Sequence, residues 1–204
     1  MLEKRLQPDR RSAQSLAPAI GDLLDEVGWK PADVDLVAVS RGPGSFTGLR
    51  VGIATAKAFA YAVGAEILGV DTLETIAAGM PPDVADVSIA VDAQRGEVVA
   101  GRFRRVEDGS LRAETPPVLV EIDAWLASVP AGVFIAGPIL RKRSVCVLEH
   151  VSAVAAEHWA PQAGWVARLA ARDYAAGRRD DLWQIVPAYS RRSAAEEKSE
   201  KRNT

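Results

Sequence analysis

Apolar residues recur at helical spacing in three long segments of the chain. In the first, Leu16, Ile20 and Leu23 fall on one face while the acidic residues fall largely elsewhere, which predicts an amphipathic helix. The second segment follows a cluster of glycines, and the third lies near the C-terminal end. The predicted helices cover residues 12–27, 47–63 and 163–176.

Shorter apolar runs on either side of the second helix predict strands. Residues 35–40 are continuous enough in apolar character to be a strand with both faces buried, and residues 66–70 predict another strand. Because the connections to the helix between them are short, the order strand, helix, strand indicates a parallel βαβ unit. A short helix at 72–79 follows the second strand.

Pro81, Pro82 and Asp83 interrupt the pattern and predict a boundary between two lobes. Beyond the break, residues 87–91 and 98–103 are apolar runs joined by a short turn, which is typical of a β-hairpin. Weaker patterns predict strands at 118–120 and 133–136 and a helical turn at 122–126. We expect an α/β protein with a first lobe at 1–80, a second at 81–190 and a charged tail at 191–204.

The composition is that of a folded protein. Of the 204 residues, 48% are hydrophobic and 25% are charged, which is enough to build a buried core. The formal net charge of −2 gives no general attraction to nucleic acid, so any RNA contact needs a local patch. With one cysteine, no signal-peptide core and no bilayer-length apolar run, the sequence predicts a soluble cytoplasmic protein without membrane contact.

The most informative segment is a glycine-rich turn between the first predicted strand and the second helix. Such a turn can bind an anion through the unpaired N–H groups of the helix, or it can simply let strand and helix pack tightly. The spacing is not that of a P-loop, and it misses the dinucleotide fingerprint because the third glycine comes one position late. Both interpretations stay open. The candidate residues are Gly42, Pro43, Gly44, Ser45, Phe46, Thr47, Gly48 and Arg50.

Other polar residues form weaker candidates. A turn that carries Asp92 and Glu97 could hold a paired acid and base, although a solvated hairpin corner with a local ion pair is more common. Basic residues at 141–143, together with Arg191 and Arg192, could contact RNA phosphates or form a solvated turn. The five tryptophans are scattered along the chain and indicate no stacking platform.

The residue spacing gives little support for a metal site or for a catalytic nucleophile. His150 and His158 are the only histidines, and they lack the spacing of a zinc or iron motif. Cys146 is interpreted as a core or surface thiol rather than a nucleophile. The sequence therefore predicts no catalytic residue and no metal ligand.

Four segments follow one another in an order that is familiar from one protein family. The most specific is Arg-Gly-Pro-Gly-Ser-Phe-Thr-Gly-Leu-Arg-Val-Gly at 41–52. Gly-Val-Asp-Thr-Leu-Glu at 69–74, Val-Asp-Ala-Gln-Arg-Gly-Glu-Val at 91–98 and Pro-Ala-Tyr-Ser-Arg-Arg at 187–192 come after it. In these segments the chain resembles the bacterial TsaB family, also called YeaZ and once grouped with glycoproteases. The similarity extends over about residues 11–198.

The resemblance implies an actin-like, Hsp70-like ATPase (ASKHA, ribonuclease-H-like) fold with two related lobes. It also implies a role in the formation of threonylcarbamoyladenosine beside the tRNA anticodon. In that pathway TsaB is a non-catalytic subunit that pairs with its paralogue TsaD, the threonylcarbamoyltransferase, and the ATPase TsaE joins them. The expected partners are therefore TsaD-type and TsaE-type proteins or a second copy in a homodimer, with tRNA reached indirectly through the complex.

The family's pairing surface implies an interface on two helices of this chain. These are the first helix, at 12–27, and the helix after the glycine-rich turn. The second helix is rich in small residues, which would let a partner helix approach closely or would pack equally well within the chain, and both interpretations stay open. If the helix pairs with a partner, glutamate at Ala56 or Ala60 is expected to weaken partner binding. The expected interface residues are Leu16, Ile20, Leu23, Ile53, Ala56, Lys57 and Ala60.

The chain departs from the family at its N-terminus. Family members start about thirty residues earlier, with a β-hairpin and a loop that faces the nucleotide cleft, whereas Met1 falls close to the first helix. We expect a first lobe without this hairpin, from a start site placed too far downstream or from a shortened paralogue. No cofactor is expected beyond weak ATP or ADP binding in the complex. A nucleotide-binding enzyme that uses the glycine-rich turn and an inactive peptidase homologue remain the alternatives.

Overall fold

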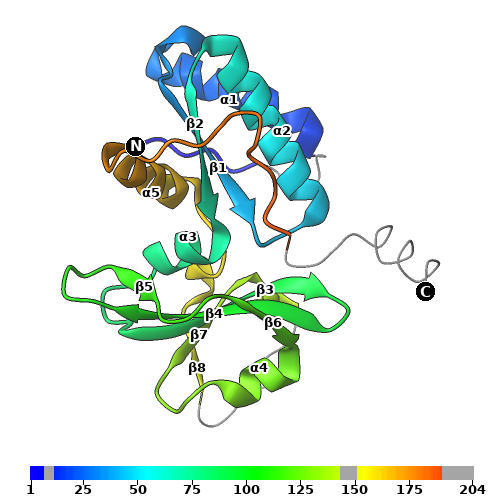
Figure 1. The fold of residues 1–204 in the computed structure, drawn as a ribbon, viewed down its shortest axis with the longest axis vertical. Helices are drawn as coiled ribbons and strands as arrows, with labels where there is room; N and C mark the ends of the chain where they lie inside the picture. The colour runs from blue at the N-terminus through cyan, green and yellow to red at the C-terminus, as the bar shows by residue number, and fades with distance from the viewer. Residues whose placement is uncertain (7–11, 143–150, 190–204) are drawn as a thin grey trace.

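The computed structural model describes residues 1–6, 12–142 and 151–189, and these residues form two lobes stacked along the long axis of the molecule (Figure 1). The upper lobe in this view holds a two-stranded sheet and the lower lobe a six-stranded sheet. Helix α3 (Thr72–Ala78) lies between them. The arrangement is that of the actin-like α/β fold expected from the sequence.

The first lobe is built on the predicted parallel βαβ unit. Strand β1 (Leu36–Gly42) pairs in parallel with β2 (Glu66–Asp71), and α2 (Phe46–Val63) connects them. Gly64 ends α2 in the left-handed conformation, with φ of 74°, so that the chain can turn directly into β2. The predicted strands and helix are confirmed to within two residues at each end.

Two helices cover the two faces of this small sheet. Ile53, Ala56 and Ala60 of α2 pack against Ile67 of β2 on one face. Helix α5 (Ala163–Ala175) packs on the other face, where Leu169 meets Leu68. The sequence placed α5 in the second lobe, but its apolar side chains complete the core of the first. The chain therefore leaves the first lobe after α3 and returns to it with α5.

The two edges of the first sheet differ. On the outer edge of β2, the N–H group of Gly69 donates to Asp180 (2.8 Å) and its carbonyl accepts from Arg178 (2.7 Å). An Arg–Asp pair thus takes the place of a neighbouring strand. Among the described residues β1 pairs only with β2.

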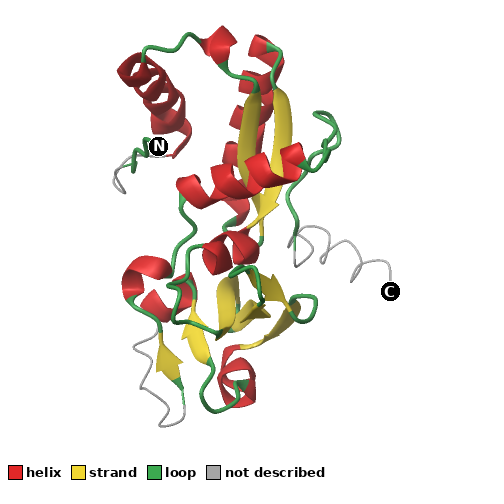
Figure 2. Cartoon of the chain, turned by 90° about the vertical axis from the view of Figure 1, so that its left-hand side faces the viewer, coloured by secondary structure: helices red, strands yellow, loops and turns green. Residues whose placement is uncertain are grey.

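The second lobe contains the predicted hairpin and a larger mixed sheet. Strands β3 (Asp86–Gln94) and β4 (Glu97–Arg105) pair in antiparallel fashion. Beyond β4 lie β5 (Leu111–Ala113) and β6 (Val118–Glu121), and beyond β3 lie β7 (Phe134–Ala136) and β8 (Ser152–Ala153). Helix α3 packs on one face of the sheet and α4 (Ile122–Ser128) on the other, and viewed from the side both lie against the sheet (Figure 2).

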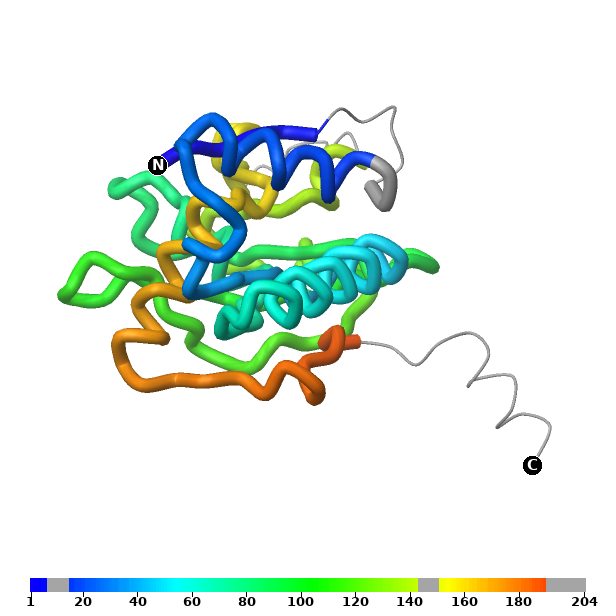
Figure 3. The backbone as a smooth tube through the Cα atoms, turned by 90° about the horizontal axis from the view of Figure 1, so that it is seen from above, coloured from blue at the N-terminus to red at the C-terminus, as the bar shows by residue number. Residues whose placement is uncertain are grey.

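Helix α1 (Ser12–Val27) lies at the margin of the first lobe. Seen from above, α2 lies between α1 and a C-terminal segment that runs along the opposite side (Figure 3). Of the described α1 side chains only Ala19 is buried, while Leu16, Ile20, Leu23 and Leu24 are half-buried. The apolar face of α1 is therefore only partly covered by this chain.

Residues 181–189, which we call the strap, lead from α5 across the first lobe and along α2 (Figure 1). Ile185 of the strap is buried in the core beside α2 and β2. Short 3₁₀ helices at Pro31–Asp33, Pro138–Arg141 and Ala156–His158 complete the fold. No helix in the part of the chain that the structure describes combines the length and the apolar character needed to cross a bilayer.

Candidate functional site

The glycine-rich turn joins the carboxyl end of β1 to the first turn of α2, which is the edge where α/β proteins commonly bind ligands. Ser45 is the N-cap of α2, and its side chain accepts from the N–H group of Gly48 at 3.3 Å. The Ser45 carbonyl accepts from the N–H group of Leu49 at 2.8 Å. Ser45 therefore has a structural task at the start of the helix.

Gly42 has a packing reason to be glycine. Its φ is 121°, and a Cβ atom at this position would lie 2.7 Å from the carbonyl oxygen of Ala188 in the strap. Beside it, the N–H group of Ala188 donates to the carbonyl of Arg41 at 2.6 Å. At Gly44, by contrast, the nearest atom to such a Cβ would be 3.9 Å away. The structure thus explains Gly42 by the approach of the strap, and the anion-binding interpretation of the turn stays a prediction.

An aromatic and arginine cluster holds the end of the strap against the first turn of α2. The Arg50 guanidinium lies 3.8 Å from the ring centroid of Phe46, and its Nε donates to the Tyr189 hydroxyl at 2.7 Å. The Phe46 and Tyr189 rings are 5.0 Å apart between centroids. The sequence selected Phe46 and Arg50 but missed Tyr189, because nothing in the sequence places residue 189 beside residue 50.

Between the lobes, the ends of β1 and β2 bring polar groups together. Asp71 caps α3, and its carboxylate accepts from the N–H group of Glu74 at 2.9 Å. Burial raises the pKa of Asp71 above its ordinary value, and the hydrogen bonds from the N–H groups of Glu74 and Leu73 only partly oppose this rise. The hydroxyls of Ser40 and Thr72 are 2.7 Å apart. These groups fasten α3 to the first sheet.

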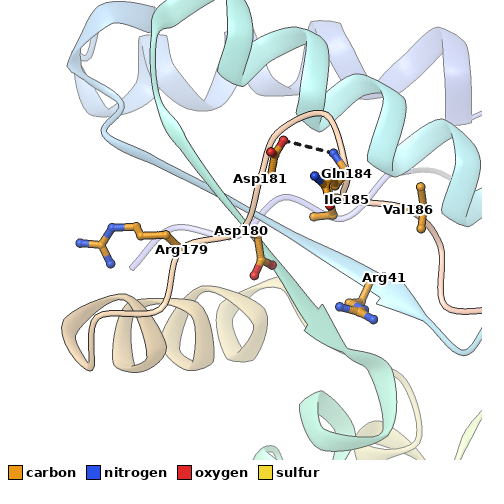
Figure 4. Close-up of a pocket in the computed structure, with 7 residues that line it drawn as sticks. All are labelled: Arg41, Arg179, Asp180, Asp181, Gln184, Ile185 and Val186. Atoms are coloured by element: carbon orange, nitrogen blue, oxygen red, sulfur yellow. Dashed lines mark hydrogen bonds between the residues drawn. The ribbon is translucent and has the colours of Figure 1, made fainter.

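A pocket of about 240 Å³ opens beside the strap (Figure 4). This volume is below the range of typical small-molecule sites. The pocket is lined by residues of the strap, by the two residues that precede the strap and by one arginine of β1. None of residues 42–50 lines it. The residues that line the pocket are Arg41, Arg179, Asp180, Asp181, Gln184, Ile185 and Val186.

The weaker candidates of the second lobe have structural partners. Asp92 pairs with Lys142 at 2.5 Å and accepts from the N–H group of Gln94 at 2.8 Å. Burial raises the pKa of Asp92, but the hydrogen bonds from Lys142 and Gln94 outweigh it and hold the pKa below its ordinary value. Arg141 donates to the carbonyl of Ala156. The carboxylate of the turn is thus in an ion pair, although with Lys142 rather than with a residue of the turn.

Several candidates lie outside the described residues: Arg143, Cys146, His150, Arg191 and Arg192, and with them the predicted tail at 191–204. The other histidine, His158, has its Nδ1 2.8 Å from the carbonyl of Gly79. Within residues 1–6, 12–142 and 151–189, no three histidine, cysteine, aspartate or glutamate side chains are grouped as metal ligands would be.

The expected partner-interface residues fall into three environments. Leu16, Ile20 and Leu23 lie half-buried on α1. Lys57 donates to the strap carbonyls of Trp183 (3.1 Å) and Ile185 (3.4 Å). The remaining three, Ile53, Ala56 and Ala60, are buried in the core of this chain. Their part in docking stays a prediction, but glutamate at Ala56 or Ala60 would disrupt this core and would not test docking alone. On α2 the exposed alanines are Ala54, Ala58 and Ala62.

Comparison with known proteins shows which family this chain resembles. Residues 7–137 match the model of the family described as TsaD, tRNA N6-adenosine threonylcarbamoyltransferase. The chain is 35% identical over 109 residues to the "tRNA threonylcarbamoyladenosine biosynthesis protein TsaB" of Bacillus subtilis (strain 168), covering 53% of this chain and 47% of that protein. It is 36% identical over 107 residues to the protein of the same name from Escherichia coli (strain K12), covering 52% and 46%. The matches thus span about half the length of these curated relatives.

A solved structure extends the similarity beyond the aligned half. YeaZ from Pseudomonas aeruginosa superposes with a TM-score of 0.75 at 28% sequence identity, over 88% of this chain and 85% of that one. The superposition therefore covers more of this chain than the alignments to the curated relatives do. With the family model matched over residues 7–137 and relatives named TsaB and YeaZ, the chain belongs to the TsaD-like proteins and, within them, to the TsaB (YeaZ) family.

Proposed function

We propose that this chain is a non-catalytic subunit in the biosynthesis of threonylcarbamoyladenosine in tRNA, and that it supports a TsaD-type threonylcarbamoyltransferase by pairing with it. The observation that carries the proposal is the similarity to proteins named for this pathway. The family model matches residues 7–137, which include the glycine-rich turn and both helices of the expected interface. A TsaE-type ATPase is the further partner that the proposal includes.

The surfaces of α1 and α2 support a docking role. Helix α1 leaves its row of half-buried apolar side chains without full cover. On α2 the alanines at 54, 58 and 62 follow one another at four-residue spacing and are exposed, so their small side chains would let another helix approach closely. The face of α2 opposite these alanines packs in the first core, and the strap lies along the face next to them.

The glycine-rich turn supports a structural role in this chain. Ser45 caps α2, and the absence of a side chain at Gly42 lets the strap approach the turn. The polar residues of this region that hydrogen-bond to other elements, Ser40, Arg50 and Asp71, all do so to hold helices and strap in place. In the proposal, the turn therefore shapes the first lobe and α2 for pairing, and the chemistry belongs to the partner.

A pairing experiment tests the proposal. The chain would be co-expressed with a tagged TsaD-type subunit and captured with it, and the affinity of the purified pair would be measured by titration calorimetry. Ala54→Glu and Ala58→Glu place a carboxylate on the exposed face of α2, and we expect each to weaken pairing at least tenfold because an interface core excludes unpaired charge.

Ala171→Glu is the matched control, since Ala171 is also an exposed alanine in the interior of a helix, here α5. It should leave pairing unchanged. Pairing that survives both α2 substitutions, or that Ala171→Glu weakens equally, would show that this face of α2 is not the docking surface. A failure of the wild-type chain to pair at all would remove the proposed function.

A further inference from the structure

Aromatic side chains gather along the line where the strap lies on α2. At one end the ring of Trp183 meets the ring of Tyr61 edge to face, with centroids 5.5 Å apart. At the other end Phe46, Arg50 and Tyr189 form the cluster described above. We call these five residues, Phe46, Arg50, Tyr61, Trp183 and Tyr189, the aromatic ridge.

The ridge is a continuous line because the strap runs antiparallel to α2. Residues 50, 57 and 61 share one face of the helix, since they are separated by seven and four positions. The strap runs along that face in the opposite direction. Tyr189 contacts Arg50, the carbonyls of Ile185 and Trp183 accept from Lys57, and the Trp183 ring meets the Tyr61 ring. At 1.5 Å per residue, the eleven positions from 50 to 61 span about 16 Å.

The end of the ridge at Tyr61 and Trp183 is far more exposed than is needed to hold the strap on α2. Tyr61 and Trp183 are each 68% exposed, although they are two of the largest apolar side chains on the first lobe. The strap does not need them as anchors, because Ile185 is buried and Lys57 holds the strap carbonyls. The N–H group of Trp183 donates to Asp181 at 2.7 Å, which fixes the turn that presents the indole. The pair is thus held in place and still open to a ligand.

Arg50 gives the ridge a cationic group that can reach an anionic ligand. In the second lobe and around α5, arginines such as Arg102, Arg172 and Arg178 pair with carboxylates. Among the described residues no ion pair joins Arg50 to a carboxylate, whereas Arg41 lines a pocket together with Asp180 and Asp181. Arg50 uses its Nε for Tyr189 and its guanidinium face for Phe46, which leaves its terminal nitrogens to reach a phosphate. Stacking rings next to arginines are the combination that binds single-stranded nucleic acid.

We infer that the aromatic ridge is a binding surface for single-stranded RNA. Exposed rings at the Tyr61 end would stack on bases, and Arg50 and Arg41 would contact phosphates at the other end. The inference goes beyond the proposed function, because it gives this chain a direct RNA contact of its own. The exposed alanines lie beside the ridge on α2, since Ala54 is four positions from Arg50 and Ala58 three from Tyr61, so pairing with the TsaD-type subunit is measured for the ridge variants as well.

Fluorescence anisotropy with the full chain and a short fluorescein-labelled oligouridylate tests the inference. We expect saturable binding that weakens with salt in proportion to the phosphates contacted. Trp183→Ala and Tyr61→Ala should each weaken it by about fivefold or more, because each removes one stacking partner. Trp29→Ala is the matched control, since Trp29 is 54% exposed but lies outside the ridge, and it should leave the affinity unchanged. Circular dichroism melting of each variant checks that the fold is retained, as expected for substitutions at such exposed positions.

Three results would overturn the inference. One is the absence of saturable binding to the oligouridylate by the wild-type chain. Another is an affinity that Trp183→Ala and Tyr61→Ala leave unchanged, or that Trp29→Ala lowers equally. The third is a loss of pairing with the TsaD-type subunit in the ridge variants while RNA affinity is retained, because the ridge would then be a protein contact.

Discussion

The carbonyl oxygen of Ala188 lies where a side chain at Gly42 would have to be. The distance to an ideal Cβ at Gly42 is only 2.7 Å, and the Ala188 N–H group donates to the carbonyl of the preceding residue, Arg41. The backbone of the strap at Ala188 thus contacts both Arg41 and Gly42 at the start of the glycine-rich turn. The turn and the C-terminal end of the described chain form one structural unit, which no local sequence pattern indicates.

This relationship predicts that Gly42→Ala is strongly destabilising. The substitution would force a Cβ against a backbone atom at a φ of 121°, and we expect a loss of about 2–4 kcal/mol in the free energy of unfolding. Gly44→Ala in the same turn should cost less than about 1 kcal/mol, because its nearest neighbour is 3.9 Å away. Urea denaturation of both variants measures the difference. Equal costs would contradict the packing explanation of Gly42.

The strap itself is predicted to be part of the first core. Ile185 is 6% exposed and packs with α2 and β2, so Ile185→Ala should cost about 2–4 kcal/mol. Its neighbour Val186 is 61% exposed, and Val186→Ala should change the free energy of unfolding by no more than about 0.5 kcal/mol. Denaturant unfolding again gives the comparison. If the two substitutions had the same small effect, the strap would not be docked in solution.

An ion pair in the second lobe predicts a pH dependence of stability. Asp86 accepts from Arg102 at 2.9 and 2.6 Å and from Arg104 at 3.2 Å, and the hydrogen bonds from Arg102 above all hold the pKa of Asp86 below its ordinary value. A carboxylate with a lowered pKa in the folded state stabilises the protein fully above its unfolded pKa of about 4. This contribution is lost as the pH falls through the folded-state pKa.

At pH 7 we expect Asp86→Asn to lose about 1–2 kcal/mol of unfolding free energy. The difference from the wild type should shrink as the pH falls below about 4, because both proteins then carry a neutral group at this position. Asp83→Asn, at an exposed position, is the control and should change stability by less than about 0.5 kcal/mol. A difference that is independent of pH would refute the assignment to the ion pair.

The buried cap of α3 predicts an unequal response to two substitutions of Asp71. Asparagine retains the side-chain oxygen that accepts from Glu74 and removes the buried charge whose pKa is raised by burial, so Asp71→Asn should be neutral or stabilising at pH 7. Asp71→Ala removes the cap as well and should cost about 1 kcal/mol. Thermal unfolding would rank the three proteins, and an asparagine variant less stable than the alanine variant would count against this account.

The sequence predicted the regular elements well because their signals are local. The periodicity of α1, α2 and α5, the apolar runs of β1 and β2 and the β3–β4 hairpin all have their cause within a short window of residues. The strands β5 and β8 were missed, since they have three and two residues and depend on pairing with β4 and β7. The helix α5 was found but assigned to the wrong lobe, because amphipathicity does not say which sheet a helix covers.

The candidate site was predicted less completely, because its contacts join residues that are far apart in the sequence. The family resemblance gave Ile53, Ala56 and Ala60 as interface residues, and the periodicity of α2 could not show whether they pack within the chain. The structure buries all three in the first core. The strap has no periodicity at all, and its contacts with Lys57 and Tyr61 depend on tertiary structure. For this reason the paired rings of Tyr61 and Trp183 could not be anticipated from scattered tryptophans.

Reconstitution of tRNA modification tests the central claim most directly. Formation of threonylcarbamoyladenosine would be measured with the TsaD-type subunit and its TsaE-type partner, with this chain added, omitted, supplied alone or replaced by Ala58→Glu. We predict product only when the wild-type chain and the TsaD-type subunit are present together, and little product with the Ala58→Glu chain. Product formed by this chain alone, or full activity without it, would contradict the account.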